Sequence, residues 1–149
     1  MKITGKYRIK APAALIWGLV TDPNILEKIT PGIKTLEENG VDKYHAISEV
    51  RVGPVRGEFK GDLAIENKVE GESCLVVLDQ KSKIGNATAE ISMKLIPQED
   101  GETEIQYTGE AKMSGMLARM GQRIMGGVIS TLSKQFFKDL EKEIEKHQN

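Results

Sequence analysis

Residues 113–146, MSGMLARMGQRIMGGVISTLSKQFFKDLEKEIEK, form a proline-free run near the end of the chain. At about 100° per residue, their apolar side chains fall on one side of a helix, so the run predicts a single long amphipathic helix. The inner side consists of Leu117, Gly121, Ile124, Met125, Val128, Leu132, Phe136 and Leu140. From Met116 to Lys146 such a helix would be roughly 46 Å long, so a broad surface must cover it. Its charged last turns are expected to extend into solvent.

The preceding residues predict that covering surface. Seven stretches alternate apolar and polar residues with a period of two, as half-buried strands do. They are residues 2–9, 33–38, 44–52, 57–66, 74–82, 87–95 and 105–113. Between the first two, Pro12 and Asp22 suit the starts of two short helices, which end near Thr21 and Ile29. Because short turns favour antiparallel neighbours, the expected fold is α+β: a seven-stranded antiparallel sheet wrapped around the long C-terminal helix.

Length and composition narrow the possible functions. A chain of 149 residues is expected to form one domain, spanning residues 1–149. Its net charge of −1 gives no overall attraction to nucleic acid, so no nucleic-acid partner is expected. The single Cys74 excludes an internal disulfide and fits a reducing, cytoplasmic location. Neither a signal peptide nor an apolar run long enough to cross a membrane is evident.

The inward-facing residues of the predicted strands differ between the two ends of the sheet. One end receives bulky side chains, whereas the other receives mostly glycine, alanine and serine, with Phe59 as the main exception. The overlying half of the helix adds Gly121 and several methionines, whose flexible thioethers suit ligands of variable shape. This pattern predicts an internal pocket for a hydrophobic small molecule. The candidate ligand-binding residues are Gly57, Phe59, Gly61, Ala87, Ala89, Gly109, Met113, Met116, Leu117, Met120, Gly121, Ile124, Met125 and Gln135.

A simpler interpretation of the same residues stays open. Glycines in strands also mark bulges and close backbone contacts, and methionines also fill gaps in closely packed cores. A bound apolar ligand or a measured cavity would separate this interpretation from a pocket.

Residues suited to catalysis are few. His45 and His147 are predicted on the surface, and no spacing resembles a metal, phosphate-loop or dinucleotide motif. We therefore assign no catalytic residue, metal or cofactor, and expect a binding protein rather than an enzyme. An enzyme of the cyclase or hydrolase type stays open as an alternative. It would need a polar group deep in the cavity, which Gln80, Tyr107 or Gln135 could supply.

Basic residues gather on the outer face at the pocket end, while the opposite end is acidic. The basic set is Arg51, Arg56, Lys60, Lys81, Lys83, Lys112, Arg119 and Arg123. A third alternative is therefore an interaction module that docks through this basic end on a partner or an anionic membrane surface. A scattered, solvated surface would have the same composition.

Three stretches carry a resemblance to a known family. KYRIKAPAALIWGLVTDPNILEKITPGIKTLEENG, VRVGPVRGEFKGDLAI and MSGMLARMGQRIMGGVISTLSKQFFKDLE resemble the CoxG family of carbon monoxide dehydrogenase subunits, within the START/Bet v 1-like (SRPBCC) helix-grip superfamily. The matching motif positions are Gly53, Pro54, Gly57, Phe59, Gly61, Gly121, Gly126, Gly127, Gln135, Phe136 and Phe137.

The resemblance implies the same seven-stranded fold, with two small helices between strands one and two and a hydrophobic cavity under the long helix. It implies a noncatalytic accessory role beside a molybdenum hydroxylase of the carbon monoxide dehydrogenase type, in maturation or membrane recruitment. The implied location is cytoplasmic or peripheral at the inner membrane face, in contact with an anionic membrane surface. Some relatives continue into a linker and an apolar tail, whereas this chain stops at Asn149, so anchoring by such a tail is not expected.

Overall fold

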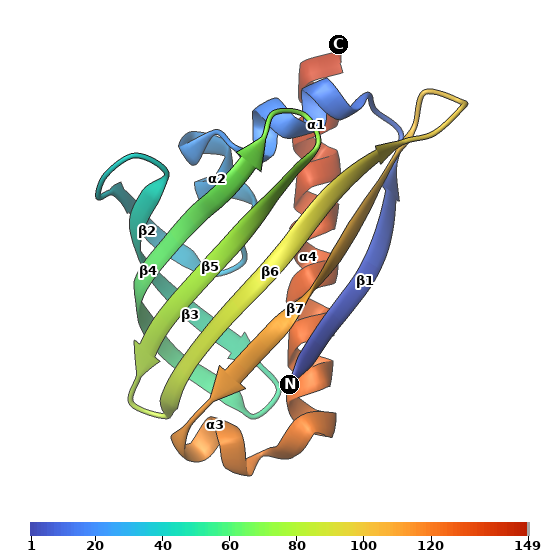
Figure 1. Ribbon diagram of the computed structural model, residues 1–149. Helices are drawn as coiled ribbons and strands as arrows, with labels where there is room; N and C mark the ends of the chain where they lie inside the picture. Colours follow the sequence, from blue (N-terminus) through green and yellow to red (C-terminus); the bar gives the residue numbers. More distant parts are fainter. Residues whose placement is uncertain (149) are drawn as a thin grey trace.

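A computed structural model describes residues 1–148 of the chain (Figure 1). The strands are β1 (Lys2–Ile9), β2 (Ile33–Glu38), β3 (Lys43–Val52), β4 (Val55–Val69), β5 (Ser73–Ser82), β6 (Gly85–Pro97) and β7 (Thr103–Met113). The helices are α1 (Ala13–Val20), α2 (Pro23–Ile29), α3 (Gly115–Arg119) and α4 (Gly121–Gln148). The strands form one antiparallel sheet in the order β1-β7-β6-β5-β4-β3-β2, which confirms the predicted fold class.

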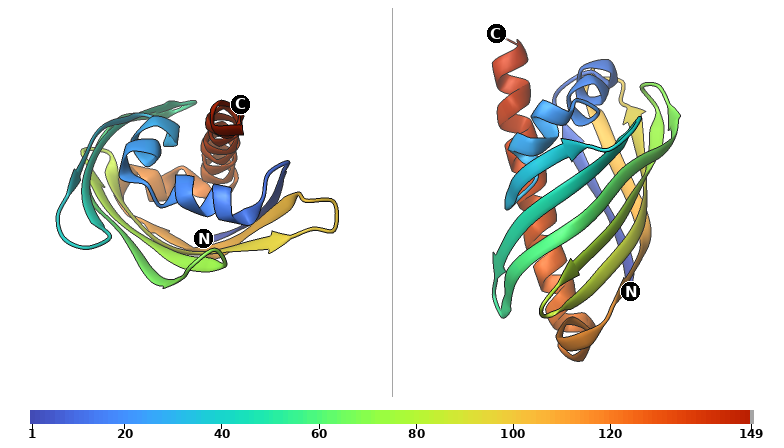
Figure 2. Two further views of the ribbon diagram at one scale, coloured as in Figure 1. Left: turned by 90° about the horizontal axis from the view of Figure 1, so that it is seen from above. Right: turned by 90° about the vertical axis from the view of Figure 1, so that its left-hand side faces the viewer.

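The pairing of residues between strands shows which side chains share each face of this sheet. Leu78 of β5 pairs with Leu63 of β4 and with Ala89 of β6, so these three side chains share the concave inner face. Exposed charges such as Glu58 and Lys60 alternate with them on the convex outer face. Seen from above, the sheet curves into a trough that holds α1, α2 and α4 on its concave side (Figure 2).

The two short helices begin as their sequences predict. Pro12 has an extended backbone immediately before α1, and Pro23 is at the first turn of α2. The Asp22 side chain accepts a hydrogen bond of 2.9 Å from the Asn24 amide, which satisfies one of the free donors at the start of α2. Together, the two helices cover one end of the trough.

The predicted single helix is in fact two helices. Gly121 has a φ of +83°, which lies outside the helical region and separates the one-turn helix α3 from α4. Met113 belongs to β7 rather than to the helix. The Leu117 amide donates to the Ile84 carbonyl at 3.0 Å, so α3 is fixed to the turn between β5 and β6. Apolar spacing alone could not reveal this break, because glycine is compatible with either backbone conformation.

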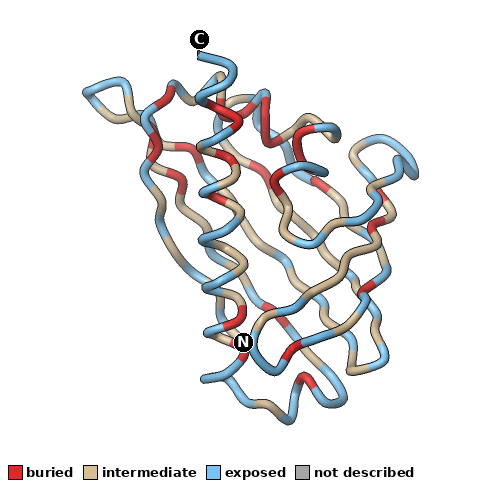
Figure 3. Tube along the Cα trace, turned by 180° about the vertical axis from the view of Figure 1, so that it is seen from behind, coloured by how far each residue is buried: buried red, intermediate tan, exposed pale blue. Residues whose placement is uncertain are grey.

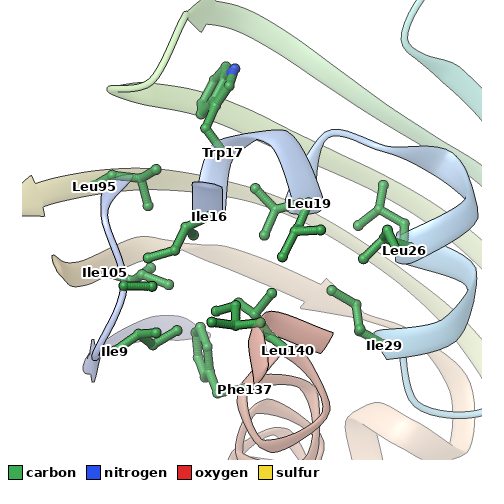
Figure 4. Packing of buried hydrophobic residues seen from close by; sticks show 14 of the residues in the cluster. Ile9, Ile16, Trp17, Leu19, Leu26, Ile29, Leu95, Ile105, Phe137 and Leu140 are labelled. Carbon is green, nitrogen blue, oxygen red and sulfur yellow. The ribbon is translucent and has the colours of Figure 1, made fainter. Parts of the chain in front are cut away.

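The larger hydrophobic cluster joins α1, α2 and the second half of α4 to the bulky end of the sheet (Figure 4). Leu140 and Phe137 of α4 are buried there against Ile9, Ile29 and Ile105. Ile144, farther along α4, is also buried. The prediction that the last turns extend into solvent was wrong for Leu140, Glu143 and Ile144, which are buried, whereas residues 145–148 are exposed.

Candidate functional site

A second, smaller cluster closes the other end of the trough. It consists of Val55, Phe59, Leu117, Met125 and Val128, and it packs α3 and the first half of α4 against the ends of β3 and β4. Figure 3 shows buried segments near both ends of the molecule, with mostly half-buried strands between them. The candidate ligand site therefore lies between the two clusters rather than at the end of the sheet, where the sequence predicted it.

The inner face between the clusters carries apolar side chains that neither cluster covers. We call this set the mid-sheet band; it consists of Ile3, Leu78, Ala87, Ala89, Ile91 and Gly109. All six are only half buried, although they lie on the concave side of the sheet. The backbone of α4 has close neighbours in α1 and α2 and few in the sheet. The mid-sheet band thus has unburied apolar surface facing α4.

Two of the predicted glycines are explained by close contact between strands. A Cβ at Gly61 would overlap the Asp79 carbonyl of β5, and a Cβ at Gly109 would overlap the Glu90 carbonyl of β6. Gly57 differs, because its Cβ would meet only the Ile84 side chain, at 3.6 Å. At Gly61 and Gly109, backbone proximity is therefore sufficient reason for glycine, as the simpler interpretation of the sequence anticipated.

Apart from Gly57 and Gly61, the predicted ligand-binding residues fall into three groups in the structure. Ala87, Ala89 and Gly109 lie in the mid-sheet band. Phe59, Leu117 and Met125 form part of the second cluster, with Met113 and Met120 packed against it. Met116, Gly121, Ile124 and Gln135 are exposed and do not face the trough.

The exposed group results from the break in the helix. The predicted inner side treats Leu117 and Gly121 as parts of one continuous helix. In the structure, α4 is a separate helix whose orientation about its axis is set by the buried Met125 and Val128. Gln135 accordingly points outward and donates to Asp139 at 2.9 Å. Gly121 is likewise exposed, and within residues 1–148 nothing lies within 4 Å of a Cβ built there.

Gln80 is a polar residue of the inner face beside the mid-sheet band, since it lies two residues after Leu78 in β5. It pairs with Ala87 across β5 and β6, and its Nε2 donates to the Asp62 carbonyl at 3.3 Å. Its Oε1 is buried and has no hydrogen-bond partner among residues 1–148. A buried acceptor without a donor is uncommon in proteins, so this atom is suited to receive a donor from another molecule after a side-chain rotation.

An aromatic clamp that the sequence did not reveal joins β1 to α4. Tyr7 stacks on Phe137, and the Tyr7 hydroxyl donates to the Glu141 carboxylate. This hydrogen bond, then burial and the Glu141 charge, raise the pKa of Tyr7 to about 12. The Tyr107 ring lies over Gly5 and also stacks on Phe137, with ring centroids 5.5 Å apart. Two features of the sequence could have indicated this clamp: the strand alternation turns Tyr7 inward, and Glu141 lies one helical turn after Phe137.

Within residues 1–148, no three His, Cys, Asp or Glu side chains are grouped so that they could hold a metal ion. Burial raises the pKa of the Cys74 thiol, which keeps it protonated at neutral pH. None of the helices in this range is long and apolar enough to cross a membrane.

Solved structures share this architecture. A conserved protein from Geobacillus kaustophilus is 31% identical, with a TM-score of 0.95 over 98% of this chain and 96% of that one. A START superfamily protein from Mycobacterium smegmatis is 16% identical, with a TM-score of 0.74 over 97% of both chains. The Zhui aromatase/cyclase from Streptomyces sp. R1128 is 12% identical, with a TM-score of 0.75 over 100% of this chain and 96% of that one. At such low identity, the last two show the fold alone.

Comparison with curated proteins gave no significant match. The model of the CoxG family of carbon monoxide dehydrogenase subunits matches residues 5–145. The match spans both hydrophobic clusters, helices α1, α2 and α3, α4 as far as Glu145, and every residue of the mid-sheet band except Ile3. The chain therefore belongs to the CoxG family and has the helix-grip fold of the START superfamily.

Proposed function

We propose that this chain is a noncatalytic accessory protein that holds a hydrophobic small molecule between α4 and the mid-sheet band. The ligand class is a lipid, an isoprenoid or a quinone-like molecule. The observation that carries the proposal is the half-buried state of Leu78, Ala89 and Ile91 on the concave face of the sheet. An apolar ligand that covered this surface would gain about 25 cal/mol per Å² removed from water.

Membership of the CoxG family supports the second part of the proposal. The protein would serve a molybdenum hydroxylase of the carbon monoxide dehydrogenase type, in its maturation or its recruitment to the membrane. A purified enzyme of that type should co-migrate with this chain in size-exclusion chromatography. Separate elution at every tested ratio would contradict this part without affecting ligand binding.

Native mass spectrometry tests ligand binding directly. Protein purified without denaturant should retain a lipophilic molecule, or, after delipidation, should take up one member of a panel of a short-chain ubiquinone, farnesol and palmitic acid. The expected result is a complex of one ligand per chain. A protein that stays empty with a broader panel of lipids and quinones would overturn the proposal.

An enzyme of the cyclase type is the second candidate, and the unpartnered Oε1 of Gln80 is the observation that favours it. Chemistry inside the trough would also draw on the Tyr107 hydroxyl. The two functions are separated by extracting the retained molecule under denaturing conditions and measuring its mass. A carrier returns the offered probe unchanged, whereas a cyclase returns a product, and substitution Gln80→Leu would stop its formation.

A further inference from the structure

We infer that one end of the molecule, which we call the α3 end, docks on an anionic lipid bilayer. The α3 end comprises α3, the first turn of α4 and the β3–β4 and β5–β6 turns, which lie together at the foot of Figure 1. This inference deepens the proposed membrane recruitment by naming the surface that performs it. It can be measured without ligand or partner enzyme, so either proposal can fail while the other stands.

The first observation is a pair of exposed apolar side chains. Met116 of α3 is 52% exposed and Ile124 of α4 is 44% exposed. Their neighbour Leu117 is 1% exposed in the second cluster, and its amide is bonded to Ile84. Leu117 therefore anchors α3 to the second cluster, while Met116 of the same helix remains exposed to solvent. Large apolar side chains fixed in this way can enter the boundary between headgroups and acyl chains.

The second observation is the absence of acidic residues from the segments that build this end. Residues 50–57, 80–89 and 111–138 contain neither aspartate nor glutamate. The cations of these segments at or beside the α3 end are Arg51, Arg56, Lys81, Lys83, Lys112, Arg119 and Arg123, whereas Lys134 and Lys138 lie farther along α4. In a chain with a net charge of −1, positive charge is thus concentrated on one half of the last helix and on two adjacent turns.

Most of this charge is not neutralised locally. Arg51 is bonded to Glu49 at 2.6 Å, so its charge is largely compensated. Within residues 1–148, Arg119, Arg123 and Lys83 form no ion pair. Each such cation near an anionic leaflet strengthens binding by about fivefold.

The opposite end of the sheet shows that exposure alone does not identify a docking surface. Val41, in the turn between β2 and β3, is 89% exposed, and Val69, the last residue of β4, is 47% exposed. Asp42 follows Val41 directly, and Glu70 and Glu72 follow Val69. An anionic surface would repel that end. Of the two ends, the α3 end is the one that combines exposed apolar side chains with uncompensated positive charge.

A bilayer fits this surface better than a protein partner does. A stable protein interface buries about 800 Å² per partner, usually around a central aromatic or aliphatic anchor in a pocket. The α3 end offers two separated apolar side chains and dispersed cations, which are the two signals that peripheral membrane binding combines. Two signals of this kind give reversible binding that weakens as salt screens the charges.

Co-sedimentation with vesicles tests the inference. The chain should bind vesicles of phosphatidylcholine mixed with phosphatidylglycerol, release as salt is raised, and bind phosphatidylcholine alone far more weakly. The variant Arg119→Glu/Arg123→Glu should reduce partitioning by about tenfold or more. The variant Met116→Ser/Ile124→Ser should reduce it severalfold.

Matched controls at the opposite end keep the test specific. Lys10→Glu/Lys43→Glu changes the net charge equally, and Val41→Ser/Val69→Ser removes two apolar groups that are at least as exposed as Met116 and Ile124. Both controls should bind as the unaltered chain does, and thermal unfolding should confirm that every variant folds. Failure of the unaltered chain to bind the mixed vesicles would overturn the inference, as would equal binding by the α3-end variants and the controls.

Insertion can be measured separately. The variant Met116→Trp should lose fluorescence in mixed vesicles that contain brominated acyl chains, whereas the native Trp17, buried in the larger cluster, should not. Equal fluorescence with brominated and ordinary lipids would show that Met116 does not enter the bilayer and would overturn the docking geometry.

Discussion

Tyr7 of β1 lies parallel to Phe137 of α4, with ring centroids 4.7 Å apart and an interplanar angle of 8°. This stack is the direct link between the edge strand and the helix, and the Tyr7 hydroxyl reinforces it by donating to Glu141. Since α4 has few close neighbours in the sheet, the clamp fixes how far the helix stands from the mid-sheet band.

Removing the aromatic clamp should destabilise the fold. Phe137→Ala leaves a cavity between two tyrosine rings and should lower the free energy of unfolding by about 3–5 kcal/mol. Tyr7→Phe keeps the stack but loses one hydrogen bond, at a cost of about 1 kcal/mol. Urea denaturation followed by circular dichroism measures both. Similar values for the two variants would show that the ring stack carries little of the stability.

The raised pKa of Tyr7 predicts a loss of stability at high pH. Folding holds the phenol proton more tightly than the unfolded chain does, because the pKa rises from 10.0 to about 12. The contribution of Tyr7 is therefore complete below about pH 10 and is lost as pH rises through about 12. Tyr7→Phe should remove this dependence. In Glu141→Gln, tyrosinate absorbance should show the Tyr7 pKa moving back toward 10.0, and an unchanged titration would exclude Glu141 as its cause.

The strand glycines should differ in their tolerance of alanine. Gly109→Ala places a Cβ against the Glu90 carbonyl and should cost about 1–3 kcal/mol, because the β6 backbone cannot move away freely. Gly57→Ala meets only the flexible Ile84 side chain and should change stability by about 0.5 kcal/mol or less. Thermal unfolding of the pair tests this contrast. Equal stability of the two variants would contradict it.

Gly121 and Gly127 form a second contrast. Gly121→Ala should destabilise by about 1–2 kcal/mol, because φ is +83° there. Gly127→Ala lies inside α4 with open space around it and should stabilise by about 0.5–1 kcal/mol. Neither change should affect ligand uptake, since neither residue faces the trough. Loss of uptake in Gly121→Ala, measured by native mass spectrometry, would restore Gly121 to the site.

Alternation with a period of two was sufficient to predict the sheet, and Pro12, Asp22 and the helical spacing of apolar residues were sufficient to predict the two short helices and the helix that crosses the trough. The break at Gly121 could not be predicted, because the apolar spacing continues through it and only the backbone angle reveals it. The candidate site moved for the same reason: Ile124 and Gln135 were assigned to the inner side through a continuous helix. Leu78 and Ile91 belong to the bulky inward-facing residues of the predicted strands. They are only half buried because α4 has few close neighbours in the sheet, and no local sequence pattern encodes that separation.

The proposed function requires space for an apolar ligand over Ala89. Ala89→Phe would fill that space from the inner face, whereas Thr88→Phe places the same ring on the outer face of the same strand. Native mass spectrometry of both variants with the ligand that the unaltered chain takes up is the most direct measurement. We expect Ala89→Phe to fold but stay empty, while Thr88→Phe binds normally. Normal binding by Ala89→Phe, or its failure to fold because the space is already filled, would contradict the proposed function.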